Sequence, residues 1–263
     1  MKKVILSLLI VLVLIAIVFV GVGLVQSKTN GVQNPIATIQ IEVYEKPIKI
    51  ELDPQSAPNA VANFIKLANS GFYSNFKMHI EENRILGDES MEMATLSNII
   101  EYPQQDYVYG IKGDFIINGF DNLLKHKKGV ITMERDDYSY FGYTQEGYNS
   151  ANCNFALLTE DIDNYNGYYA AFGNIIEGMD VLDAIAATRV EEKEETKTNT
   201  EENSSESKEK ESVNVITITS ISVDTFGVDY GVPEVVNNEE TMEKVNAIYN
   251  QYFGGNSNAI VTE

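Results

Sequence analysis

Residues 38–52, TIQIEVYEKPIKIEL, contain two runs in which apolar and polar side chains alternate. The apolar positions of the two runs are Ile39, Ile41, Val43, Ile48, Ile50 and Leu52. A period of two is typical of strands that bury one face, and the polar segment 44–47 between the runs predicts the turn of a β-hairpin. The fold is therefore expected to start as an antiparallel sheet.

A short helix is predicted directly after this hairpin. Pro58 stands where a first helical turn tolerates proline, apolar residues follow at helical spacing, and Gly71 lies where a helix would end. Residues 181–187 predict a second short helix much later in the chain. We expect these two helices to pack on the sheet.

The chain between the two helices has the composition of strands joined by long loops. It is rich in Gly, Asn, Asp and Tyr, and its apolar pieces are short, as in 129–133 (GVITM) and 155–158 (FALL). Many short strands of this kind are typical of a β-barrel. Residues 213–219 (VNVITIT) predict one more strand near the end of the domain.

Two further segments interrupt or follow this pattern. Residues 191–212 are a Glu/Lys/Ser/Thr/Asn-rich insertion without a large apolar residue, which predicts disorder. The tail 231–263 contains a helical stripe of apolar residues, namely Met242, Val245, Ile248 and Tyr252. Such a stripe predicts an amphipathic helix, which would dock either on its own domain or on a partner.

The N-terminal end predicts a membrane anchor. Residues 4–25 are apolar apart from Ser7 and glycines, and a helix of that length spans roughly 33 Å, about one hydrocarbon core. Lys2 and Lys3 place residues 1–3 in the cytoplasm by the positive-inside rule. A cleaved signal peptide is the alternative, with a shorter apolar run and an A-x-A-like site. We expect an uncleaved single-pass anchor, a linker at 26–37, and the domain on the outer face of the cell membrane.

Composition limits the functions that remain. A formal net charge of −20 argues against nucleic acid as a partner, because phosphate backbones would be repelled. The single cysteine excludes an intramolecular disulfide, and the two histidines, His79 and His126, share no metal-ligand spacing. We expect neither a metal nor a cofactor.

Several segments, in order along the chain, resemble the cyclophilin family of peptidyl-prolyl isomerases. They are 48–52 with 57–65 and 71–73, then 110–115, 118–120, 124–133, 169–181 and 223–230. The resemblance covers about residues 38–230. It implies a mainly β fold, a closed antiparallel barrel capped by two helices. In this chain the barrel would follow the transmembrane helix predicted from residues 4–25.

The resemblance also implies a reaction and a donor. Rotation about an X-Pro bond crosses a barrier of about 18–20 kcal/mol, and a donor aimed at the prolyl nitrogen favours the twisted amide. Family members carry an arginine directly after a Phe-His pair for this task. Here His79 keeps its place, but Ile80 stands at the arginine position. Arg84 and Arg135 are the candidate substitute donors.

The other family positions predict where a substrate would bind. Ile85 falls at a glutamine position, Glu134 at a small-residue position, and Ala156 at the aromatic that walls the proline pocket. The full set of substrate-binding candidates is His79, Ile85, Glu134, Asn154, Ala156, Tyr165 and Tyr169.

Two functions therefore remain open. The first is a membrane-tethered prolyl isomerase that assists the folding of exported proteins, with proline-containing polypeptides as its partners. The second is a cyclophilin-fold module of weak or absent activity that binds a protein or peptide partner. The sequence favours the isomerase by resemblance, whereas Ile80 favours the binding module.

Overall fold

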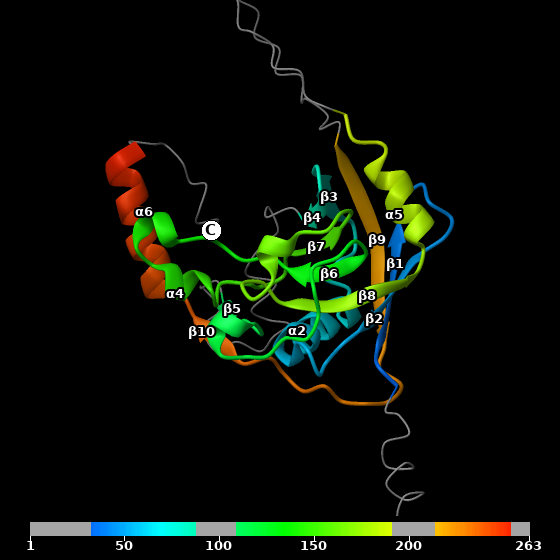
Figure 1. The fold of residues 1–263 in the computed structure, drawn as a ribbon, viewed down its shortest axis with the longest axis horizontal. Helices are drawn as coiled ribbons and strands as arrows, with labels where there is room; N and C mark the ends of the chain where they lie inside the picture. The colour runs from blue at the N-terminus through cyan, green and yellow to red at the C-terminus, as the bar shows by residue number, and fades with distance from the viewer. Residues whose placement is uncertain (1–32, 88–108, 191–213, 254–263) are drawn as a thin grey trace, which may run out of the picture.

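The computed structural model describes residues 33–87, 109–190 and 214–253. Eight strands close into a barrel in the order β1-β2-β8-β6-β7-β4-β3-β9, and all neighbouring strands are antiparallel (Figure 1). The strands are β1 (Ile36–Ile41), β2 (Ile48–Leu52), β3 (Phe76–Ile80), β4 (Arg84–Gly87), β6 (Val130–Met133), β7 (Phe155–Leu158), β8 (Ala171–Glu177) and β9 (Val215–Asp224). The predicted mainly β, closed antiparallel barrel is confirmed.

The predicted hairpin is strands β1 and β2, which pair with Ile39 opposite Ile48. The prediction that Val43 continues the alternation of the first strand is wrong. Strand β1 ends at Ile41, and Val43 lies in the turn with φ of 64° and 91% of its surface exposed. The strand ends early because the register with β9 shifts after Gln40 and the Tyr44 amide closes a turn onto the Ile41 carbonyl.

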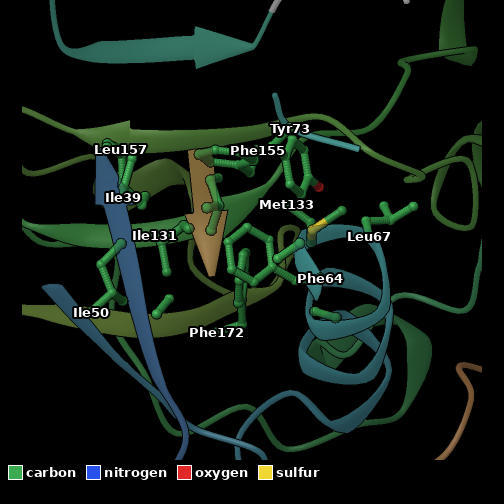
Figure 2. Close-up of a cluster of buried hydrophobic side chains, with 14 of the residues drawn as sticks. Ile39, Ile50, Phe64, Leu67, Tyr73, Ile131, Met133, Phe155, Leu157 and Phe172 are labelled. Atoms are coloured by element: carbon green, nitrogen blue, oxygen red, sulfur yellow. The ribbon is translucent and has the colours of Figure 1, made fainter. Parts of the chain in front are cut away.

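The two predicted helices occur as α2 (Pro58–Asn69) and α5 (Met179–Ala186). Figure 2 shows Phe64 and Leu67 of α2 among the side chains that fill the barrel. The Phe64 ring lies 5.3–5.5 Å from the rings of Tyr73, Phe155 and Phe172. Helix α2 is therefore anchored by aromatic packing in the core.

Helix α5 starts at a point where the backbone passes close to the β1–β2 turn. Gly178 has φ of 89°, and a Cβ there would lie 2.7 Å from the Pro47 carbonyl oxygen. Only glycine accepts both the left-handed conformation and this contact without strain. The helix then buries Val181, Leu182 and Ile185 in the same core as α2.

The C-terminal tail packs on its own domain. Strand β10 (Val235–Asn237) pairs with β5 (Tyr109–Ile111), and α6 (Glu239–Phe253) follows it (Figure 1). Val245 of the predicted stripe is buried, and the Met242 sulfur accepts a hydrogen bond from the Tyr138 hydroxyl at 2.9 Å. Tyr252, at the far end of the stripe, is exposed. Docking on the domain is thus the alternative that the structure shows.

Four short elements complete the described chain: η1 (Ile116–Asn118), η2 (Ser139–Phe141), α4 (Thr144–Gly147) and η3 (Asp163–Tyr165). The anchor predicted at 4–25, the insertion predicted at 191–212 and most of the predicted linker lie outside the described residues. Within the described residues, no helix has the length and apolar character needed to cross a membrane.

Candidate functional site

The outer face of the barrel wall carries a second group of apolar side chains, separate from the core. We call it the outer apolar cluster. Its buried members are Val130, Ala156, Leu158, Ile162 and Ala171, and Leu86, Leu124 and Tyr165 pack against them. The cluster arises because β4, β6, β7 and β8 point alternate side chains to opposite faces of the wall. Only the partly buried Leu86, Leu124 and Tyr165 bring its apolar atoms to the surface.

Arg84 stands beside this surface, held by three partners. Its Nε donates to Glu81 Oε2 at 2.6 Å, and its Nη1 donates to Glu134 Oε1 at 3.0 Å. The same Nη1 also contacts the hydroxyl of Tyr165, which packs on the outer apolar cluster. Among the residues that the structure describes, none accepts a hydrogen bond from Nη2.

The ion pairs around Arg84 are largely removed from water. The side chains of Arg84 and Glu134 are 18% and 12% exposed. Burial lowers the pKa of Arg84, but Glu134 and Glu81 outweigh it, and the pKa ends above its ordinary value. Burial raises the pKa of Glu134 to about 7, against the opposing effect of Arg84 and with a further contribution from Glu81. Glu134 therefore changes charge near neutral pH.

Four side chains are stacked along one side of the site. The Arg135 guanidinium lies 4.9 Å from the ring centre of Tyr148 and 4.4 Å from that of Tyr169. Tyr169 in turn stacks on Tyr165 with ring centres 3.9 Å apart. Arg135 also donates to the carbonyls of Tyr168 and Asp136, at 3.0 Å each. Its charge is engaged in holding this stack rather than directed at the outer apolar cluster.

His126 supports Tyr165 from beneath. The two rings meet edge to face at 5.6 Å, and the imidazole nitrogens lie 3.0 Å from Thr132 Oγ1 and 3.2 Å from Asn166 Oδ1. Burial lowers the pKa of His126 to about 4, so the ring is neutral at physiological pH. This role could not be predicted from the sequence, because Tyr165 and Asn166 lie about 40 residues from His126 along the chain.

Most of the predicted site residues are brought together. Arg84, Glu134, Ala156, Tyr165 and Tyr169 lie in or against the network just described.

Asn154 is adjacent to them. Its carbonyl accepts the Glu134 amide at 3.0 Å, and its side-chain oxygen lies over Gly87 of β4, 3.2 Å from where a Cβ would stand.

Three other candidates are placed by the alternation of β3 and β4. Ile80 and Ile85 lie opposite each other and both face the barrel core, 5% and 0% exposed. The prediction that Ile85 binds substrate is therefore wrong, because its side chain packs in the core. His79 lies opposite Leu86 and is half-buried on the outer side. Leu86 was not among the predicted site residues, although the alternation along the strand places it on the outer side, next to Ile85.

The described residues contain no group of three or more His, Cys, Asp or Glu arranged to hold a metal ion. A small apolar hollow opens beyond Arg135, lined among others by Ile111, Phe115 and Met133. It contains none of Arg84, Glu134 or Tyr165. The polar groups that converge on an apolar surface lie at Arg84, and we place the candidate site there.

The comparisons with known proteins agree with this architecture. The family model described as cyclophilin type peptidyl-prolyl cis-trans isomerase/CLD matches residues 38–206. A closed antiparallel barrel of eight strands is the class of fold that the structure defines. The chain belongs to the cyclophilin-type peptidyl-prolyl cis-trans isomerase family, as a divergent member.

Curated relatives are similar over the barrel. Peptidyl-prolyl cis-trans isomerase A of Dickeya dadantii is 28% identical over 144 residues, which are 55% of this chain and 68% of the relative. Peptidyl-prolyl cis-trans isomerase cyp18 of Streptomyces antibioticus is 26% identical over 154 residues, 59% of this chain and 86% of the relative. A solved cyclophilin-type isomerase of Cryptosporidium parvum aligns with a TM-score of 0.48 at 18% identity, covering 73% of this chain and 98% of that one.

His126→Gln is expected to remove a pH-dependent part of the stability. Because the folded state holds the pKa of His126 near 4, below its ordinary 6.5, the wild type loses stability as the pH falls between these values. The loss from this group is about 3 kcal/mol at most. Urea unfolding of wild type and variant at about pH 7.5 and 4.5 checks it. An advantage of the wild type that is equally large at both pH values contradicts the assignment.

Proposed function

We propose that this protein binds proline-containing segments of exported polypeptides on the outer face of its barrel and speeds their cis-trans isomerisation, with Arg84 as the donor. Membership of the isomerase family supports the reaction class. The observation that carries the assignment of the donor is the position of Arg84: a guanidinium held by two carboxylates beside an apolar surface, with Nη2 uncommitted among the described residues.

The chemistry requires one positioned donor and little else. In the twisted amide the nitrogen loses its resonance with the carbonyl and becomes basic, so a cationic N–H aimed at it stabilises the transition state more than the ground state. A donor of this kind contributes about 3–4 kcal/mol where water is excluded. Ile80 makes no such contribution, because its side chain is apolar and faces the core.

The outer apolar cluster supplies the surface for the proline ring. Leu86 and Tyr165, which are only partly buried, present apolar atoms next to Arg84. Burying a proline ring on such a surface gains on the order of 25 cal/mol per Å² of apolar area. Ala156 is fully buried, so the ring would contact Leu86, with Tyr165 beside it.

The site is proposed to act outside the cytoplasmic membrane. The support is the apolar run at 4–25 together with Lys2 and Lys3 before it, which the positive-inside rule reads as an N-terminus in the cytoplasm. A tethered isomerase at that surface would meet chains as they leave the membrane, when slow X-Pro isomerisation limits their folding.

The second candidate, a binding module, is favoured by one specific observation. The charge of Arg84 is already matched by Glu81 and Glu134, and a matched cation stabilises a basic nitrogen less than a free one. The same face would still hold an X-Pro segment, without accelerating its isomerisation.

Arg84→Ala is expected to lower kcat/KM for X-Pro isomerisation by about 100-fold or more, because it removes the donor. The measurement is isomerisation of several X-Pro peptides by the purified full-length protein, followed by NMR exchange. Arg189→Ala is the matched control: this arginine follows α5, and its loss should leave the rate unchanged. Ile80→Arg is no substitute, since it would bury a guanidinium in the core.

The outcomes separate the two candidates. A full-length protein that is inactive on every peptide but binds them, with binding lost in Arg84→Ala, makes the domain a binding module. An active wild type whose rate survives Arg84→Ala overturns Arg84 as the donor.

Deletion of residues 4–25 is expected to move the protein from the membrane fraction to the soluble fraction of the cell, because it removes the apolar run. In intact spheroplasts, added protease should digest the domain of the undeleted protein. A domain that resists protease until the membrane is broken would place it on the cytoplasmic side and refute the proposed location.

A further inference from the structure

Glu134 stands in an unusual position for a carboxylate. It comes directly after β6 with a mostly buried side chain, and its amide is fixed to the Asn154 carbonyl at 3.0 Å, which holds its backbone rigidly against β7. Its side chain forms an ion pair with Arg84 across the edge of the outer apolar cluster. A carboxylate that is buried and fixed in this way constrains its partner more than a surface ion pair would.

Two carboxylates hold the Arg84 guanidinium, each at a different nitrogen. Glu81 accepts from Nε and Glu134 accepts from Nη1, so two different edges of one planar group are bound. A planar guanidinium held at two edges cannot rotate, and its remaining nitrogen, Nη2, points in one fixed direction. Without Glu134 the group is held at Nε by Glu81, a more exposed residue, and by the Tyr165 hydroxyl alone.

We propose that Glu134 is a positioning residue whose ionised form holds Arg84 in place for isomerisation, so that the site is active above neutral pH and weakened below it. The inference rests on the proposed function, since it assigns a regulator to the same donor.

The groups that face Glu134 from the surrounding elements set the pH at which it changes charge. They are Arg84 of β4, Glu81 of the β3–β4 turn, the neighbouring Arg135, and Tyr165 and Tyr169 from the segment at and after η3. Burial, with Glu81 adding to it, raises the pKa of Glu134 to about 7 although Arg84 opposes the shift. The carboxylate is therefore protonated at mildly acidic pH, and its charge-assisted bond to Nη1 becomes a weaker neutral one.

The reaction itself makes this testable, because X-Pro isomerisation transfers no proton. A pH dependence seen with a blocked peptide that does not titrate belongs to the protein. For the wild-type full-length chain, kcat/KM should rise roughly tenfold from about pH 6 to about pH 8, as the ionised fraction of a group with a pKa near 7 climbs from about one tenth to about nine tenths.

Three variants isolate Glu134. Glu134→Gln keeps the shape and an acceptor oxygen but cannot ionise, so its rate should stay near the low-pH value of the wild type at every pH. Glu81→Gln should move the inflection to lower pH, since Glu81 raises the pKa of Glu134. Glu82→Gln, an exposed neighbour in the same turn, is the matched control and should leave both rate and inflection unchanged.

The result that overturns the proposal is an active wild type with a flat profile, or a Glu134→Gln variant that keeps the rise. If the full-length chain is inactive at every pH, the proposed function fails, and NMR of the side chains then decides on Glu134 itself. The Arg84 Nε–H signal should shift with the Glu134 carboxyl carbon on one titration near pH 7. An Arg84 signal that ignores that titration refutes the positioning role without reference to activity.

Discussion

Each strand of the barrel wall points its successive side chains alternately into the core and toward the outside. Closure into eight strands commits every second residue to a core in which α2 and α5 also take part. The residues left over on β4, β6, β7 and β8 form the outer apolar cluster. A shift of one residue in any strand would exchange the two sets, so the core fixes the site as firmly as it fixes the fold.

This constraint also decides on which face of the wall the proposed donor, Arg84, lies. Ile80 and Ile85 pair across β3 and β4 and both lie in the core, where an arginine would bury an uncompensated charge. Arg84, one residue before Ile85, takes the opposite face by the same alternation. There it pairs with Glu81 in the turn before it and with Glu134, directly after β6, and the two carboxylates offset the cost of its partial burial.

The sequence was sufficient for the fold and for part of the site. Period-two runs and the order of the matching segments predicted the barrel and its hairpin, because core patterning is a local property. The structure was needed for the side of the wall on which a residue lies, which is why Ile85 was assigned to the ligand face and Leu86 was missed. The pairing of Arg84 with Glu134 joins positions 50 residues apart, and the contact of His126 with Tyr165 depends on loop packing that leaves no periodic signal.

The claim that Arg84 has taken over the donor's role is tested most directly by a structure of the protein with an X-Pro peptide bound. If Arg84 is the donor, the proline ring should lie against Leu86 and Tyr165, with Arg84 Nη2 within hydrogen-bonding reach, about 3 Å, of the prolyl nitrogen. A peptide bound elsewhere, or a proline on this surface with Arg84 turned away from its nitrogen, would contradict it.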